Sequence, residues 1–158
     1  MNKVVSGLLA LTVLFAGCVQ PPVNDENEDS NIGTIIEGPG FMEQARYEPF
    51  TKQAYEDALA SGKVVYLEFY ANWCPICAAQ APEIEAAFKE LPTTKVSGFR
   101  VNYNDSETDE DEKNLARQFG ITYQHTHVIL DSNGSLVKKS LEVWDKETII
   151  SEVRKAYQ

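Results

Sequence analysis

In the last two thirds of the chain, apolar residues show two different spacings. Val64–Tyr70 is almost continuously apolar and rich in residues that favour strands, which predicts a central strand covered on both faces. After Cys74, apolar positions recur every three to four residues, which predicts a helix to about Glu90 with a kink at Pro82. A buried strand that runs into a helix is the unit from which α/β folds are built.

The same criteria predict further elements on both sides of this unit. Three more helices are expected over 51–61, over 109–119 and from Asp145 onwards, and three more strands over 98–103, 127–130 and 136–141. The Asn133-Gly134 step is typical of a tight hairpin between the last two strands. Strands joined by helices and closed by a hairpin predict an α/β fold, a three-layer α/β/α sandwich with a mixed central sheet of about four strands.

The N-terminus has the pattern of a targeting signal. A basic start at Met1–Lys3 precedes the apolar run Val4–Ala16, which is too short for a transmembrane helix. The run ends at Ala16-Gly17-Cys18 and resembles a lipoprotein signal, in which residues 1–17 are removed and Cys18 is lipidated. The alternative is an uncleaved anchor. Both interpretations tether the chain to the cell membrane, facing the periplasm or the cell exterior.

Residues 18–45 are predicted to be an acidic linker that contains proline and glycine, and residues 46–158 to be the folded domain. The formal net charge of the chain is -10, which repels phosphate backbones and argues against nucleic acid as a partner.

The chain has three cysteines, and only Cys74 and Cys77 lie close in sequence. This number does not make a disulfide framework, so the pair indicates redox or metal chemistry. A structural zinc site needs two further ligands, and no second Cys-x-x-Cys is present. At a helix N-terminus, free N–H groups and the helix dipole are expected to lower the pKa of Cys74, the predicted nucleophile. Cys77, one turn further along, is the predicted resolving thiol.

The segment Glu68-Phe69-Tyr70-Ala71-Asn72-Trp73-Cys74-Pro75-Ile76-Cys77 resembles the active-site segment of the thioredoxin family. Pro82, the Phe119-Gly120-Ile121 segment and the C-terminal hairpin follow in family order, so the resemblance covers residues 46–158. It implies a thioredoxin fold and exchange of disulfides with protein thiols. It also implies a redox-active Cys74-Cys77 disulfide in place of a cofactor.

Glu68 stands in the middle of an apolar strand, where burial raises the pKa of a carboxyl group. The resemblance implies that Glu68 transfers a proton to and from Cys77; the alternative is a residue at the strand's edge with its head in water. Arg100 is near the position of a family lysine that pairs with this acid, or else is an ordinary surface residue. Trp73 and Tyr70 are expected to shape the substrate surface.

Pro75 and Ile76 between the cysteines are expected to tune the reduction potential, in a direction that the sequence does not reveal. The family's cis-proline position falls on His125. A cis bond without proline costs about 2.5–4 kcal/mol, so the Gln124–His125 bond is expected to be trans.

Three interpretations of His125 remain open. It tunes the Cys74 thiolate or shuttles protons, it completes a copper, zinc or iron–sulfur site with Cys74 and Cys77, or it is inert. His127 and Trp144 are expected to be structural. Acidic residues at 105, 107 and 109–112 are interpreted as a solvated face that favours the next helix.

The sequence therefore predicts a lipid-anchored, extracytoplasmic thiol–disulfide oxidoreductase. That it reduces protein disulfides is implied by the resemblance alone. The resemblance makes a membrane electron-transfer protein an expected partner. A metal-binding or metal-delivery module built on Cys74, Cys77 and His125 is the alternative, and a redox-inert interaction domain is the third hypothesis.

Overall fold

The computed structural model describes residues 44–157. The predicted signal 1–17, Cys18 and all of the predicted linker except its last two residues lie outside this range. Within it, no helix has the length and apolarity needed to cross a membrane. The elements, in chain order, are β1 (Tyr47–Pro49), α1 (Lys52–Ala60), β2 (Val64–Tyr70), α2 (Pro75–Phe88), β3 (Val96–Asn102), α3 (Glu110–Gln118), β4 (Thr126–Leu130), β5 (Leu136–Ser140) and α4 (Lys146–Lys155).

The central sheet has five strands in the order β1-β3-β2-β4-β5. β3 pairs in parallel with β1 and β2, whereas β4 is antiparallel to both β2 and β5. The sheet is mixed, as predicted, and has one strand more than the four that were located in the sequence. The missed strand, β1, has three residues and ends at Pro49, which fits an edge position because proline donates no backbone hydrogen bond. A segment this short shows no apolar alternation in the sequence.

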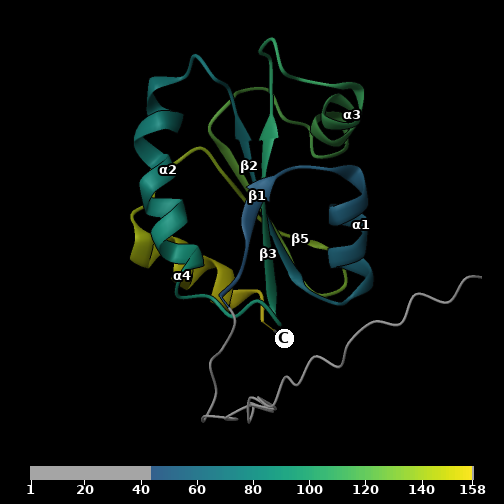
Figure 1. The fold of residues 1–158 in the computed structure, drawn as a ribbon, viewed down its shortest axis with the longest axis vertical. Helices are drawn as coiled ribbons and strands as arrows, with labels where there is room; N and C mark the ends of the chain where they lie inside the picture. Colours follow the sequence, from purple (N-terminus) through teal and green to yellow (C-terminus); the bar gives the residue numbers. More distant parts are fainter. Residues whose placement is uncertain (1–43, 158) are drawn as a thin grey trace, which may run out of the picture. The chain divides into compact units, whose positions relative to one another are not determined.

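Helices cover both faces of the sheet. In Figure 1, α2 and α4 lie on one side and α1 and α3 on the other. Each side has its own cluster of buried apolar residues, one built on Tyr66 and Ile84 and the other on Leu67 and Leu115. Because side chains alternate along a strand, β2 contributes to both clusters and is covered on both faces. This confirms the prediction of a central buried strand.

The predicted helix starts are confirmed. Thr51, Asp109 and Asp145 each accept a hydrogen bond from a backbone N–H in the first turn of the helix that follows. The predicted hairpin also forms, with Gly134 in the left-handed region at φ 77° and the Asp131 carboxylate accepting from the backbone N–H groups of Asn133 and Ser135.

Candidate active site

The two cysteines stand where β2 passes into α2. Cys74 is the N-cap residue of α2, and its Sγ accepts a hydrogen bond from the Cys77 backbone N–H at 3.2 Å. Both are free thiols. Cys74 is 5% exposed and Cys77 0%, so an incoming disulfide can reach Cys74 first. Pro75 occupies the first turn of the helix, and Ile76 is 52% exposed beside the pair.

The turn before Cys74 is held by the loop that follows β3. The Asn72 backbone N–H donates to the Asp105 carboxylate at 2.9 Å, and Trp73 Nε1 donates to the Asn104 carbonyl at 3.1 Å. Asn104 reaches that position with φ 57°, which asparagine tolerates better than most residues. Asp105 thus has a structural contact with the active-site turn. The contact could not be predicted from the sequence because it joins positions far apart in the chain.

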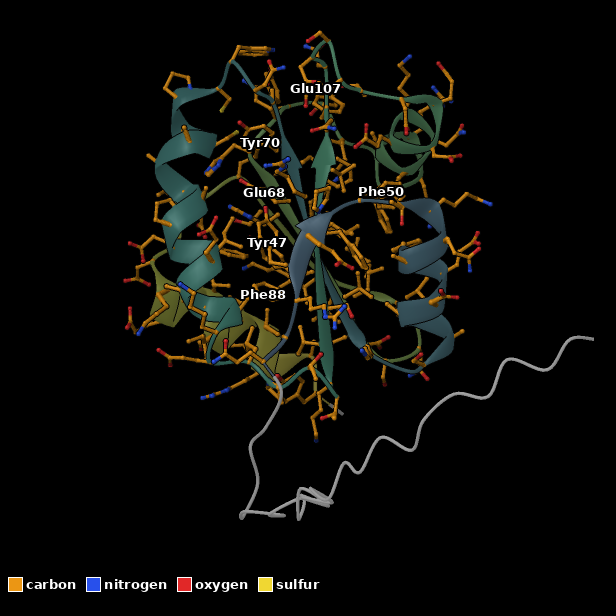
Figure 2. All side chains as sticks on the ribbon, viewed as in Figure 1. Tyr47, Phe50, Glu68, Tyr70, Phe88 and Glu107 are labelled. Atoms are coloured by element: carbon orange, nitrogen blue, oxygen red, sulfur yellow. The ribbon has the colours of Figure 1, made fainter. Side chains whose placement is uncertain are left out.

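Glu68 is fully buried, so the interpretation as a strand-edge residue with its head in water was wrong. One carboxylate oxygen accepts a hydrogen bond from the Tyr47 hydroxyl, and the other has no hydrogen-bond partner. Burial raises the pKa of Glu68 to about 7, while the Tyr47 hydroxyl and the Arg100 guanidinium limit the rise. Figure 2 shows Tyr47, Glu68 and Tyr70 on the side of the sheet that faces α2. Tyr47 was not predicted because it lies on the missed strand β1.

Arg100 pairs with Glu68 in the β2–β3 register, which confirms the predicted neighbourhood. Its guanidinium lies 5.0 Å from the centre of the Tyr70 ring, in the range of a cation–π contact. The residue is half-buried. Its positive charge lowers the pKa of Glu68 and therefore keeps part of the carboxylate ionised near neutral pH.

Cys77 is a weak acid in this setting. Burial raises the pKa of its thiol to about 12, and the hydrogen bond with the Cys74 side chain and the nearby Glu68 charge act in the same direction. The Cys77 thiol therefore needs a base when it acts as a nucleophile, because only the thiolate attacks a disulfide.

His125 precedes β4 in an unusual conformation. No peptide bond in residues 44–157 is cis, so the expected trans Gln124–His125 bond is confirmed. His125 has φ 60°, and its backbone N–H donates to the Phe69 carbonyl at 2.6 Å, a bond that proline could not make. The side chain is buried, and neither ring nitrogen has a hydrogen-bond partner. Burial lowers the pKa of His125, which favours the neutral ring.

Three potential ligand atoms converge beside Cys77. A carboxylate oxygen of Glu68, the sulfur of Cys77 and a ring nitrogen of His125 lie within 4.8 Å of one another. The structure therefore brings His125 to Cys77, as one interpretation expected. The third member of this group is Glu68, in place of the Cys74 that the sequence suggested.

His127 and Trp144 belong to the core, as predicted. Tyr66 Oη and His127 Nδ1 are 2.7 Å apart, and the Trp144 ring stacks on the imidazole at 4.7 Å. Burial, followed by the nearby His125, lowers the pKa of His127 to about 3, so the ring is neutral near pH 7. Gln80 of α2 clamps the Trp144 backbone by bonding both its N–H and its carbonyl.

The acidic stretch is more than a solvated face. Glu112 is buried, and its carboxylate accepts from the backbone N–H groups of Asn102 and Asp109. Together with the Asp109 side chain it forms a capping box at the start of α3. The stretch thus fixes the start of α3 and, through Asp105, the active-site turn.

Comparisons with known proteins agree with this geometry. The family model described as Thioredoxin matches residues 46–155. The chain is 29% identical to a thioredoxin of Chlamydia muridarum over 101 residues, which cover 64% of this chain and 89% of that protein. It is 32% identical to an uncharacterized protein of Haemophilus influenzae over 97 residues, which cover 59% of this chain and 56% of that protein.

Among solved structures, Trxlp from Edwardsiella tarda is 28% identical and superimposes with a TM-score of 0.57, covering 68% of this chain and 98% of that chain. Proteins of the thioredoxin family use a redox-active disulfide and need no cofactor. A cysteine at a helix N-terminus that is slightly more accessible than its partner, a fully buried second cysteine and a buried acid beside it are consistent with this chemistry. The chain belongs to the thioredoxin family of thiol–disulfide oxidoreductases.

Proposed function

We propose that the protein reduces disulfides of other proteins outside the cytoplasmic membrane, using Cys74 as nucleophile and Cys77 as resolving thiol. The placement of Cys77 beside the buried Glu68 carries this proposal. Cys74 is the more accessible thiol, whereas Cys77 is enclosed with a carboxyl group whose pKa lies near neutrality.

The reaction has two exchange steps. The Cys74 thiolate attacks one sulfur of the substrate disulfide, which forms a mixed disulfide and releases one substrate thiolate. The Glu68 carboxylate then accepts the Cys77 proton, and the Cys77 thiolate attacks the Cys74 sulfur. The second substrate sulfur leaves and takes up a proton, and the Cys74-Cys77 disulfide forms. Two electrons have passed from the protein to the substrate.

The reducing direction has physical support. A thiol–disulfide protein is strongly oxidising when its reduced form is stabilised, as happens when a thiolate is stabilised. Here burial raises the pKa of Cys77 to about 12, so the Cys77 thiolate adds nothing to the stability of the reduced form, and the contribution of Cys74 is what a glutathione titration measures. The exposed apolar side chains of Trp73, Ile76 and Tyr123 offer a surface for an unfolded or extended protein substrate.

Equilibration with glutathione buffers tests the direction. A midpoint close to the roughly −270 mV of thioredoxins supports a reductase, and one close to the roughly −120 mV of strong oxidants contradicts it. Cys77→Ser should accumulate a mixed disulfide with a model protein disulfide, because the resolving thiol is missing. Cys74→Ser is the matched control and should trap none. Equal trapping by both variants would contradict the assigned roles.

The location rests on the sequence of the N-terminus. The basic start, the short apolar run and Cys18 support a lipid anchor that places the domain outside the cytoplasmic membrane. Fractionation of producing cells tests this. With a lipid anchor, Cys18→Ser should abolish incorporation of a labelled fatty acid, whereas the wild-type chain should carry the label. A label that is absent from both would contradict lipidation.

A further inference from the structure

The buried site beside Cys77 contains polar atoms that have no hydrogen-bond partner and that the redox reaction does not explain. One oxygen of Glu68 and both ring nitrogens of His125 have no hydrogen bond, although both residues are at most 5% exposed. A buried polar group without a partner costs about 1–3 kcal/mol. Proton transfer from Cys77 requires one such group. It does not account for a carboxylate and an imidazole that converge on the same sulfur.

We propose that the reduced protein binds one Zn²⁺ ion through the Glu68 carboxylate, the Cys77 thiolate and the His125 imidazole. The three atoms are within 4.8 Å of one another, and about 3.3–3.6 Å is expected between ligands in a tetrahedral site with metal–ligand bonds of about 2.0–2.3 Å. Side-chain movements of roughly an ångström close this difference.

The set of donors favours zinc. Zinc accepts sulfur, nitrogen and carboxylate ligands together, whereas copper(I) prefers soft thiolate ligands and magnesium prefers oxygen. One carboxylate and one thiolate also balance the two charges of the ion. This neutrality matters because all three ligand residues are buried, where an uncompensated charge is costly.

The surroundings hold the ligands in place. The Tyr47 hydroxyl bonds one oxygen of Glu68 and leaves the other free, which is how a second residue commonly orients a ligating carboxylate. The His125 backbone is fixed by its bond to the Phe69 carbonyl and by φ 60°. Glu68 lies on β2, and Cys77 lies in the first turns of α2. These are rigid elements, which suit a metal site.

Metal binding and disulfide formation exclude each other, because Cys77 Sγ cannot hold Zn²⁺ and be oxidised at the same time. Binding of Zn²⁺ releases the Cys77 proton and holds the protein in its reduced form. At a free zinc concentration of 100 times Kd, the reduced form is favoured about 100-fold, which is roughly 60 mV for a two-electron couple. Zinc would therefore inhibit turnover reversibly.

Titration of the full chain carrying Cys18→Ser, purified in detergent and kept reduced, tests the proposal. This substitution leaves Cys74 and Cys77 as the only thiols. Zn²⁺ is titrated against a competing chelator, and Co²⁺ serves as the spectroscopic probe of thiolate ligation. We expect one ion per chain and a thiolate-to-cobalt band that Cys77→Ser abolishes and Cys74→Ser retains.

Glu68→Gln and His125→Asn should each weaken Zn²⁺ binding by at least about 100-fold, beyond the 10–100-fold typical of residues that only support ligands. Asparagine tolerates the left-handed backbone of position 125. Glu107→Gln, on an exposed acid far from the cluster, should bind like the parent chain. Circular dichroism of each variant verifies folding.

Several outcomes overturn the proposal. These are the absence of stoichiometric binding in the parent chain, unchanged affinity in Glu68→Gln, or a loss in Cys74→Ser as large as in Cys77→Ser. The last result would instead assign the site to Cys74, Cys77 and His125. Because the assay measures metal and not disulfide exchange, its failure leaves the reductase proposal intact, and the converse also holds.

Discussion

The two faces of the sheet differ in how completely their buried polar groups are bonded. On the side of α1 and α3, the buried polar side chains of Glu112 and Thr126 have hydrogen-bond partners and the rest of the cluster is apolar. On the side of α2 and α4, buried polar atoms within residues 44–157 lack partners, at Glu68, Arg100, Asn102, His125, His127 and Tyr157.

This difference assigns separate tasks to the two faces. The apolar face contributes burial free energy, at about 25 cal/mol per Å² of apolar surface, and its buried carboxyl group, Glu112, is bonded by two backbone N–H groups. The polar face contains Glu68 and His127, whose pKa values are strongly shifted by burial, and it sacrifices stability to hold them. Substitutions on the apolar face should therefore change mainly stability, whereas substitutions at Glu68 on the polar face should change mainly the rate of disulfide exchange.

The largest expected effect comes from the buried imidazole of His127. Its pKa is about 3 in the folded state and near 6.5 in the unfolded state, so the unfolded chain binds an extra proton between these values. Stability should be complete above about pH 6.5 and fall by on the order of 4–5 kcal/mol as the pH drops to about 3. Urea unfolding across this range measures the loss.

His127→Phe should flatten this pH dependence and leave the part that other groups contribute. At about pH 8 the variant should still lose about 1–3 kcal/mol, because the Tyr66 hydroxyl loses its partner. Equal slopes for the two proteins would contradict the assignment of the acid sensitivity to His127.

Leu67→Ala tests the apolar face. Leu67 is fully buried among residues of the α1 and α3 side, so its truncation should lower the free energy of unfolding by about 3–4 kcal/mol. The glutathione midpoint should stay at the parent value, because the substitution does not touch the cysteines. A shifted midpoint would show that the two faces are not independent.

Glu68→Gln should change stability in the opposite direction to Leu67→Ala. The folded carboxyl has a pKa of about 7 against an ordinary 4.5, so the folded state binds the extra proton and stability falls as the pH rises between these values. Without the titrating group, the variant should be more stable than the parent by about 3 kcal/mol at about pH 8 and similar at about pH 4. Chelator and reductant are present in both measurements.

The same variant should resolve mixed disulfides about 100-fold more slowly, because Cys77 loses its base. A variant with an unchanged rate would remove Glu68 from the mechanism. A variant that resolves mixed disulfides more slowly and is also less stable would contradict the inference that the polar face gives up stability to hold Glu68.

Asp105→Ala should have the smallest effect. It removes the acceptor for the Asn72 backbone N–H, and we expect a loss of about 1 kcal/mol. Trp73 fluorescence should report a looser turn, since its indole bonds the neighbouring Asn104 carbonyl. Glu107→Gln, with an exposed side chain in the same loop, is the control and should leave both measurements unchanged.

Local patterns predicted most of the fold. The continuous apolar run of β2, the helical spacing after Cys74 and the capping residues Thr51, Asp109 and Asp145 each determine structure from neighbouring positions. β1 was missed because its three residues become a strand only by pairing with β3. Its short length carries no periodic signal, and Pro49 argues against a strand unless the position at the sheet's edge is known.

The sequence by itself determined the cysteine pair and its place at a helix start, since both depend on spacing within one strand–helix unit. It placed Glu68 on the apolar strand, but the structure decided that its carboxyl group is out of water. Only the tertiary structure decided which side chains meet there. The Tyr47 hydroxyl on Glu68, the Asp105 carboxylate on Asn72 and the His125 ring beside Cys77 arise from strand pairing and loop closure. These contacts join residues that are 21 to 48 positions apart in the chain, and local propensity carries no information about contacts between such distant positions.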